Sequence, residues 1–419
     1  MTAKNFVNFH VLISHSPSCL NRDDMNMQKT AVFGGVNRVR ISSQSLKRTM
    51  RTSSYYEANL GQASIRTREL ERLIPLFVDK LGDQFEPDIV AKTMELFVKS
   101  KVEAEETEDN ENPEDGPSEP ASKKLAVAPW ALEEIRVLCG VVKDVVLTKE
   151  EISNAKEKAA KQKGRKKKPE KEIIDDVLTK KRVKAVEGKI ESIRKAIGSA
   201  LDIVLSGRMA TSGLMTSVDG ALAMAHAVTT HAVEPQDVDW FTAVDDLTQD
   251  AGEMGAGHLD TQQFSSGVFY RYASLNLKQL QMNLGLLPDM KSAETDASRK
   301  RALEIAKHAF HMLATAVPSA KQQSFAAHNP GDFAIVSFGD QPISLANAFE
   351  QPVKQAREGG FLQPSIENLV RYWAQINRAY GLDESARAFA VGNGVKLGEM
   401  PAFTFLKDME SWIENGGTD

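Results

Sequence analysis

The chain has 419 residues and a mass of 46.1 kDa, a length that predicts two or three structural units rather than one compact core. Hydrophobic residues make up 42% and charged residues 26%, which excludes a fibrous or wholly disordered protein. No apolar run is long enough for a transmembrane helix, and the first residues lack a signal-peptide pattern. The two cysteines, Cys19 and Cys139, cannot form a disulfide framework or a four-cysteine zinc site. We therefore expect a cytoplasmic protein.

The net charge of −5 conceals an uneven distribution along the chain. Residues 1–51 contain eight Lys or Arg and two acidic residues, a net charge of +6, whereas the remaining 368 residues have a net charge of −11. This asymmetry indicates a local site for a polyanion. A solvated basic face explains the count equally well.

Two strands are predicted at the start of the chain. Alternating apolar residues predict a half-buried strand over Asn5–Ser14, with one polar face. After a glycine turn, Val36–Ile41 alternates again and places Arg38 and Arg40 on the same face. Both arginines are therefore candidate nucleic-acid contacts.

A basic amphipathic helix is predicted directly after the second strand. Ser42 and Ser43 are candidate N-caps for a helix that runs to about Arg51. Lys47 and Arg51 are four residues apart and share one face, while Leu46 and Met50 share another. Cations, hydroxyl groups and the free N–H groups of a helix N-terminus suit a phosphate backbone. An amphipathic helix with a solvated basic face is the alternative explanation.

The middle of the chain, from about residue 59 to 199, is mostly helical and is interrupted by two charged segments. Residues 103–122 are rich in acids and proline, and residues 156–171 contain nine basic residues. Their low hydrophobicity predicts flexible loops for both segments. Residues 173–205 are expected to form one long helix.

The rest of the chain alternates strands with helices and predicts an α+β domain built around an antiparallel sheet. We expect a small-residue helix over Gly220–His231 and a long β-hairpin whose arms are Asp239–Leu247 and Leu259–Ser266. The further predicted elements are a strand over Val268–Leu275, a helix over Ser298–Ala316, a strand over Asp332–Phe338, and helices near Ile366–Tyr380 and Lys407–Asn415. The chain contains no internal repeat.

Two further motifs are weak by themselves. Glycines bracket a segment with one cation, Arg208, and one soft apolar side chain, Met209, which would pack against a base or, more commonly, fill a core. The glycine-rich tip of the predicted hairpin carries His258 and Leu259. A leucine at such a tip inserts into a partner or between bases, or is simply a singly exposed leucine.

Catalytic motifs are sparse. Asp23 and Asp24 are adjacent acids, which more often cap turns and form ion pairs than hold a metal. His308 and His311 share a helical face without the glutamate of a metalloprotease motif. The chain has neither a P-loop nor a nucleophile elbow, so we expect no enzyme, no metal and no cofactor.

Long blocks of the sequence resemble the CasC family, the backbone subunits of the type I-E CRISPR surveillance complex Cascade. The blocks are His10–Met25, Arg40–Arg48, Ser206–Gly213, Asp239–Leu247 and Phe264–Tyr272. The resemblance implies an RRM-like (ferredoxin-like) palm, a helical fingers insertion and a long β-hairpin thumb. The corresponding ranges are 1–58, 200–239 and 268–419 for the palm, 59–199 for the fingers and 240–267 for the thumb.

The same resemblance implies a non-catalytic subunit that polymerises as a helical filament along the guide RNA (crRNA) in antiviral defence. Each thumb displaces one nucleotide at regular intervals, and the remaining nucleotides pair with target DNA to form an R-loop. The implied partners are crRNA, target DNA, further copies of the chain, and the large, small, guide-end-capping and guide-processing subunits. Related backbone subunits of type III complexes cut RNA with a loop aspartate, so a metal-dependent RNA endonuclease that uses Asp23 or Asp24 is the rival interpretation. A scaffold that contacts only protein is the third.

The resemblance also assigns roles to individual residues, beside those that the pattern itself suggests. Met209 and Leu259 resemble the two wedges beside the displaced base. The candidate RNA ligands are Arg22, Lys29, Arg38, Arg40, Ser42, Gln44, Lys47, Arg48, Arg51, Arg208, Met209, His258 and Leu259, and the candidate target-DNA ligands are Lys180, Lys181 and Lys184.

Overall fold

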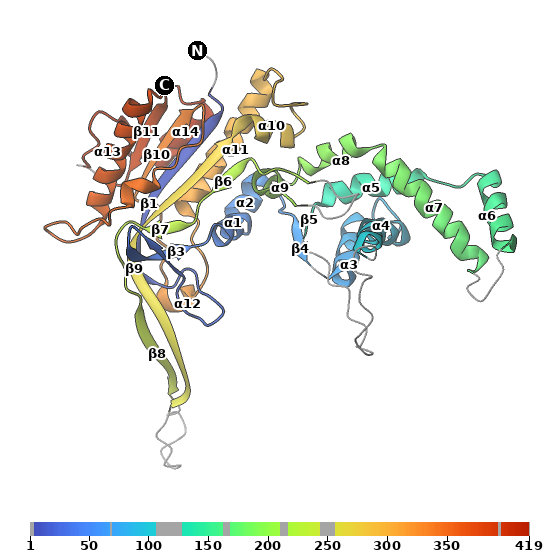
Figure 1. The fold of residues 1–419 in the computed structure, drawn as a ribbon, viewed down its shortest axis with the longest axis horizontal. Helices are drawn as coiled ribbons and strands as arrows, with labels where there is room; N and C mark the ends of the chain where they lie inside the picture. The colour runs from blue at the N-terminus through green and yellow to red at the C-terminus, as the bar shows by residue number, and fades with distance from the viewer. Residues whose placement is uncertain are drawn as a thin grey trace, which may run out of the picture. The chain divides into compact units, whose positions relative to one another are not determined.

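The computed structural model describes residues 4–67, 69–105, 128–161, 168–209, 217–243, 256–392 and 395–418 (Figure 1). The chain forms two compact units. One unit, here called the sheet unit, comprises Met1–Leu60, Leu222–Lys278 and Ala293–Asp419. The other, the helical unit, comprises Gly61–Ala221 and Gln279–Ser292, so residues 200–221 and 279–292 lie in the helical unit and not with the sheet.

One large sheet organises the sheet unit. Ten strands of the described chain pair in the order β12-β11-β10-β1-β9-β7-β3-β2, with β6 and β8 also paired to β9. All pairings are antiparallel except that of β11 with β12. The strands are β1 (Phe6–Ser18), β2 (Thr30–Phe33), β3 (Val36–Ile41), β6 (Leu222–Met224), β7 (Ala227–Thr229), β8 (Gln236–Ala243), β9 (Ala256–Asn276), β10 (Phe333–Gly339), β11 (Ser385–Ala390) and β12 (Ala402–Phe403).

Strand β9 serves both the sheet and the hairpin. Its second half, Ser265–Asn276, pairs with β1, and its first half, Ala256–Phe264, pairs with β8. The sequence predicts a hairpin arm and a separate following strand here, whereas the structure has one continuous strand of 21 residues. The predicted hairpin is therefore an extension of a central strand of the sheet.

Helices cover both faces of the sheet. Phe9 on one face of β1 stacks on Phe310 of α11 with ring centroids 6.2 Å apart, and the opposite face packs against Leu369 of α13. The helices of this unit are α1 (Ser43–Arg51), α2 (Ser54–Leu60), α11 (Asp296–Thr315), α12 (Gln322–Phe325), the 3-10 helix η2 (Ala346–Phe349), α13 (Leu362–Tyr380) and α14 (Leu406–Glu414).

The prediction of a polar, solvent-facing side on the first strand is wrong, because β1 is central and both of its faces are covered. His10 is buried on the face expected to be polar, where its Nδ1 lies 2.8 Å from the Tyr270 hydroxyl. The same hydroxyl accepts the Leu345 N–H at 3.1 Å, so His10 and Tyr270 belong to one buried hydrogen-bonded group. Burial lowers the pKa of His10 to about 3, so the ring is neutral.

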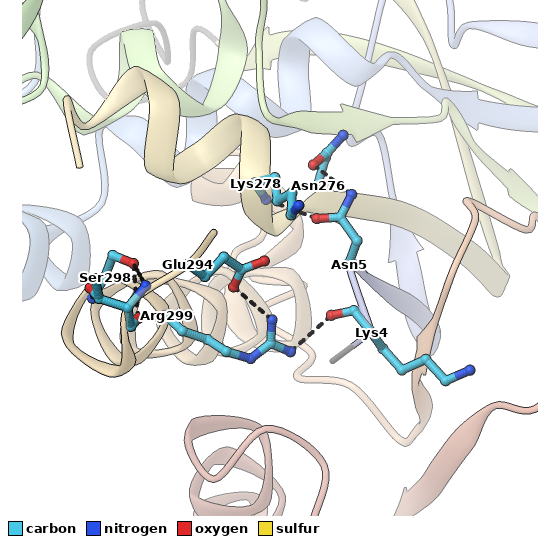
Figure 2. Close-up of polar contacts among 8 residues, drawn as sticks. Lys4, Asn5, Asn276, Lys278, Glu294, Ser298 and Arg299 are labelled. Carbon is cyan, nitrogen blue, oxygen red and sulfur yellow. Dashed lines mark hydrogen bonds and ion pairs between the residues drawn. The ribbon is translucent and has the colours of Figure 1, made fainter. Parts of the chain in front are cut away.

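The N-terminal end of β1 is fixed by a polar network (Figure 2). Asn5 donates from Nδ2 to the Asn276 side-chain oxygen at 3.1 Å, which ties β1 to the end of β9. Arg299, in the first turn of α11, pairs with Glu294 at 2.9 Å and donates to the Lys4 carbonyl at 2.8 Å. The strand, its neighbour and a covering helix are thus joined at one point.

The prediction of a helix over Gly220–His231 is wrong. Leu222–Met224 forms β6 and Ala227–Thr229 forms β7, both paired with β9, and β7 pairs with β3 as well. Alanine-rich sequence favours a helix locally, but pairing with neighbouring strands satisfies the same backbone groups within the sheet.

The helical unit has its own apolar core, made by α3, α4, α5 and α8 with a small two-stranded sheet beside them. Phe77, Met94, Ile135 and Leu138 are fully buried in it. The elements are β4 (Ile65–Thr67), α3 (Leu70–Leu81), α4 (Pro87–Glu105), β5 (Ala128–Trp130), α5 (Leu132–Asp144), α6 (Lys149–Lys161), α7 (Glu170–Glu187), α8 (Ile190–Ile197) and α9 (Leu201–Ser206), and α10 (Leu277–Asn283) belongs to it from Gln279 on.

Three predictions for this unit differ from the structure. The long helix expected over residues 173–205 is divided into α7, α8 and α9, with breaks at Gly188 and Gly198. Helix α6 continues to Lys161 and α7 begins at Glu170, so only part of the basic segment predicted as a loop is outside helices. Helix α4 also includes residues 103–105, while 106–122 and 162–167 lie outside the described residues. Among the described helices, none has the length and apolar character needed to cross a membrane.

Candidate nucleic-acid interface

Helix α1 forms where the sequence predicts it, and its apolar face packs on the sheet. The Ser42 hydroxyl accepts a hydrogen bond from the Ser45 N–H at 3.3 Å, which makes Ser42 the N-cap. Leu46 and Met50 are buried, and Leu46 packs in a cluster that includes Phe269 of β9. The sheet therefore fixes which face of α1 carries the polar side chains.

The polar face of α1 carries four of the predicted RNA ligands. Gln44 and Arg48 are exposed, and Lys47 and Arg51 are partly exposed. The Lys47 ammonium donates to the Leu222 carbonyl at 3.2 Å, which ties this helix to β6. Two basic residues, Arg48 and Arg51, lie in the last turn, where they complement the negative end of the helix dipole.

The loop before β2 is a tight turn closed by its own side chains. Arg22 is exposed and donates to the Asn26 side-chain oxygen at 2.5 Å. The Asp23 carboxylate accepts the Met27 N–H at 3.0 Å, which shows a turn-closing role. Asp24 is exposed, and among the residues that the structure describes no group of three His, Cys, Asp or Glu side chains is arranged to hold a metal.

A second basic group lies on β3 and at the starts of its neighbours β2 and β7. The Arg40 N–H donates to the Lys29 carbonyl at 2.9 Å, and the Arg40 guanidinium donates from Nε to the Thr30 carbonyl at 2.9 Å. Its Nη1 lies 3.0 Å from Nδ1 of His226, which directly precedes β7. We call Lys29, Arg40 and His226 the cationic cluster. Sequence reasoning missed His226, because its segment was predicted to be helical and nothing in the local pattern links it to Arg40.

The predicted role of Arg38 as an RNA ligand does not agree with the structure. Arg38 is fully buried, although it shares a strand face with Arg40. Its guanidinium donates to the carbonyl oxygens of Phe33, Thr229 and Phe349 at 3.2, 3.0 and 2.9 Å. The segment around η2 covers this end of the face, so Arg38 holds the fold together and is not accessible to a nucleic acid.

The turn beside Arg38 requires glycine. Gly34 has φ of +61° and approaches the covering segment so closely that a Cβ would lie 1.6 Å from the Glu350 carbonyl oxygen. A Cβ added to Gly35, whose φ is +76°, would have no atom of a non-neighbouring residue within 4 Å. The close approach at Gly34 is what allows the segment to cover Arg38.

Arg208, in the helical unit, is also inaccessible. Its side chain is 0% exposed and forms a two-point ion pair with Glu134 of α5, with N–O distances of 2.7 and 2.8 Å. It also donates to the Pro129 carbonyl at 3.4 Å. The prediction that Arg208 contacts RNA therefore does not agree with the structure, because its guanidinium is buried and bonded to Glu134 and Pro129.

Of the two predicted wedge residues, the structure describes the exposure of Met209 but only the backbone of Leu259. Met209 directly follows the buried Arg208, and the residue is 89% exposed. Leu259 and His258 lie within β9, with Leu259 opposite Phe241 of β8, and not in the glycine-rich tip as the sequence predicts. Residues 244–255 and the side chains of both residues lie outside what the structure describes.

The three lysines proposed to bind target DNA lie on α7. Lys180 and Lys184 are exposed and, four residues apart, share one helix face. Lys181 is turned toward α6, where its ammonium lies 2.6 Å from a Glu151 carboxylate oxygen. This hydrogen bond and the adjacent positive charge lower the pKa of Glu151, so the pair is an ion pair at neutral pH.

Most of the predicted ligands in the first 51 residues are thus brought together in the sheet unit. The Asn21 side chain accepts the Ser42 N–H at 2.9 Å, which joins the turn of Arg22 to the start of α1. The cationic cluster is continuous with the same turn through Lys29. The exposed or partly exposed members are Arg22, Lys29, Arg40, Gln44, Lys47, Arg48 and Arg51, which we call the basic surface.

Comparison with known proteins gives a full-length match. The chain matches 98% of its length to all of a chain titled "CRISPR RNA-guided surveillance complex, pre-nicking", with 25% identity and a TM-score of 0.66. A second structure, titled "CRISPR RNA-guided surveillance complex", matches 97% of this chain and 98% of its own, with 21% identity and a TM-score of 0.53, and shows the same fold. Comparison with curated proteins yields no match. The model of the CT1975-like protein family matches residues 7–412, and the chain therefore belongs to that family.

Proposed function

We propose that this chain is a non-catalytic backbone subunit of a type I-E CRISPR Cascade complex. Copies of the chain polymerise along the crRNA in the cytoplasm, displace nucleotides at regular intervals and present the others to target DNA. The observation that carries the proposal is the match over 98% of the chain to all of a surveillance-complex chain. Further copies and the large, small, guide-end-capping and guide-processing subunits complete the assembly.

The basic surface supports this proposal independently. Arg48 is exposed and Lys47 and Arg51 are partly exposed on one helix face, and the cationic cluster adds further charge on neighbouring strands. Contacts of this kind neutralise phosphates and position a nucleic acid without reading its sequence. That chemistry suits a protein whose specificity comes from base pairing in the guide.

In this proposal the sheet unit corresponds to an RRM-like palm, the helical unit to the fingers, and the β8–β9 hairpin to the thumb. Met209 and Leu259 act as the wedges on either side of the displaced nucleotide. Lys180 and Lys184 contact the incoming target DNA, and Lys181, already paired with Glu151, contributes less. The exposed side chain of Met209 is the described feature that favours its assignment.

Salt-dependent RNA binding tests the proposal. Binding through phosphates releases counterions, so the affinity for a single-stranded RNA falls with a log–log slope of roughly −0.7 per neutralised phosphate. Lys47→Ala/Arg51→Ala is expected to weaken binding to all RNA sequences alike and to flatten that slope by roughly 1–2. Fluorescence anisotropy with a labelled oligonucleotide across a salt series measures both quantities.

The matched control is Lys300→Ala/Arg301→Ala, which removes two exposed positive charges from α11. It should leave the slope and the affinity unchanged. If the wild-type chain binds no RNA, or if the control flattens the slope as much as Lys47→Ala/Arg51→Ala does, the proposed RNA surface is wrong.

The wedge assignment has a separate test. Met209→Ser/Leu259→Ser should weaken guide binding only modestly, because phosphate contacts provide most of the affinity. Chemical probing of assembled guide RNA should show bases that react at a fixed interval in the wild type, with the contrast lost in the double variant. An interval that persists with full contrast would mean that the hairpin backbone displaces the bases.

A further inference from the structure

His226 lies in an unusual electrostatic setting on the sheet unit. Arg40 of β3 pairs with Val228 of β7. His226 lies two positions before Val228, so it is on the same face of the sheet as Arg40. Lys29 is the neighbour of Arg40 on the other side. The imidazole is exposed and its Nδ1 lies 3.0 Å from Nη1 of Arg40.

The contact with Arg40 fixes the protonation state of His226 in the free chain. A guanidinium donates hydrogen bonds and cannot accept them, so Nδ1 of His226 must be the acceptor and the ring is neutral. Partial desolvation lowers the pKa of His226, and the positive charges of Arg40 and Lys29 lower it further. The described charged groups that act on this ring are thus two cations, Arg40 from β3 and Lys29 from the segment before β2.

A bound phosphate would reverse these electrostatics. Its negative charge compensates Arg40 and Lys29, and its oxygens accept hydrogen bonds from the guanidinium and from a protonated imidazole. Arg40 then turns Nη1 from His226 to the phosphate, Nδ1 takes a proton from solvent, and the imidazolium becomes a third cation at the site. The guanidinium thus exchanges a neutral acceptor for a charged one, and the phosphate offsets the repulsion of the imidazolium by Arg40 and Lys29.

We propose that Lys29, Arg40 and His226 together form a site for an RNA phosphate, and that His226 takes up a proton when the phosphate binds. The inference rests on the proposed RNA-binding function and adds a residue and a proton to it. Lys29 and Arg40 were candidate ligands from the sequence, whereas His226 is a ligand that geometry alone identifies.

The sign of the pH dependence follows from linkage. The complex binds more protons than the free chain between the lowered pKa of free His226 and its raised pKa in the complex. In that interval the affinity for RNA rises as the pH falls, by at most about tenfold per pH unit for one proton. Above the upper pKa the dependence on His226 disappears.

Isothermal calorimetry provides the test. A single-stranded RNA oligonucleotide is titrated into the full chain near neutral pH in two buffers of different ionisation enthalpy and equal ionic strength, which counts the protons taken up on binding. Wild type should take up a fraction of a proton, and His226→Gln none. His226→Lys, which carries a fixed charge, should restore the affinity without proton uptake.

The matched control is His328→Gln, which removes another exposed histidine of the same unit. It should take up the same fraction of a proton as wild type. Proton uptake that survives His226→Gln, or RNA binding by wild type without proton uptake, overturns this inference and leaves the proposed function standing. Absence of RNA binding by the wild type overturns the proposed function itself.

Discussion

Substitution of Arg208 tests whether its side chain stabilises the fold or binds nucleic acid. Its side chain is 0% exposed and that of its partner Glu134 is 1% exposed. Arg208→Met would leave the Glu134 carboxylate buried without its cation, and breaking a buried pair in this way costs about 3–5 kcal/mol. Arg208→Met/Glu134→Leu removes both charges and should recover most of that loss, since buried pairs are often replaceable by apolar residues.

Amide hydrogen exchange measures this effect locally, because Glu134 lies in the first turn of α5. A loss of 3–5 kcal/mol corresponds to exchange in α5 that is faster by about two to four orders of magnitude. The control is Arg136→Met on the same helix, which breaks a half-exposed pair with Glu133 and should change exchange by less than about tenfold. If Arg208→Met weakened RNA binding and left amide exchange in α5 unchanged, the conclusion that Arg208 stabilises the fold and does not bind RNA would be refuted.

Three further outcomes are expected. Gly34→Ala should lower the free energy of unfolding in urea by roughly 1–3 kcal/mol from its left-handed backbone alone and by more from the clash, so it should exceed the loss in Gly35→Ala, where no atom lies nearby. Burial lowers the pKa of both His10 and His15 to about 3, so over the range from about pH 6 down to 3 the unfolded chain binds protons that the folded chain does not bind. Each histidine should lower the free energy of unfolding by about 1.4 kcal/mol per pH unit as the pH falls, and His10→Asn should remove its own share of that slope and leave the share of His15. In a target-DNA binding assay with assembled complex, Lys184→Ala should weaken binding more than Lys181→Ala, whose ammonium is already paired; the reverse order would contradict the α7 assignment.

Patterns within a short stretch of sequence were reliable guides to this fold. Helix α1 is capped by Ser42, one of the two expected N-caps, and buries Leu46 and Met50 on its apolar face, because capping and amphipathicity depend on neighbours three or four positions away. The strands β1, β3 and β10 and the helices α11, α13 and α14 were likewise visible in the local pattern. The α+β character of the chain followed from their order.

The features that the sequence did not reveal depend on residues far apart in the chain. Arg38 is covered by a segment that lies 311 residues later, and Arg208 is paired with a glutamate 74 residues earlier. Each looked like an exposed cation because nothing nearby in the sequence shows what lies over it. His226 was missed for the same reason, since its partner Arg40 lies 186 residues away.

Because β9 belongs to both the sheet and the hairpin, the length of the hairpin can change without changing the sheet. Residues Ser265–Asn276 are held by β1, so changes between Gln236 and Phe264 leave the register of the sheet untouched. Removing two residues from each arm would shorten the hairpin by about 7 Å and keep every remaining side chain on its face, whereas removing one from each arm would turn all the side chains beyond the cut. Hairpin length can therefore change in steps of two residues per arm. Under the proposed function, the distance that each hairpin spans along the guide would then change in evolution by fixed steps and not continuously.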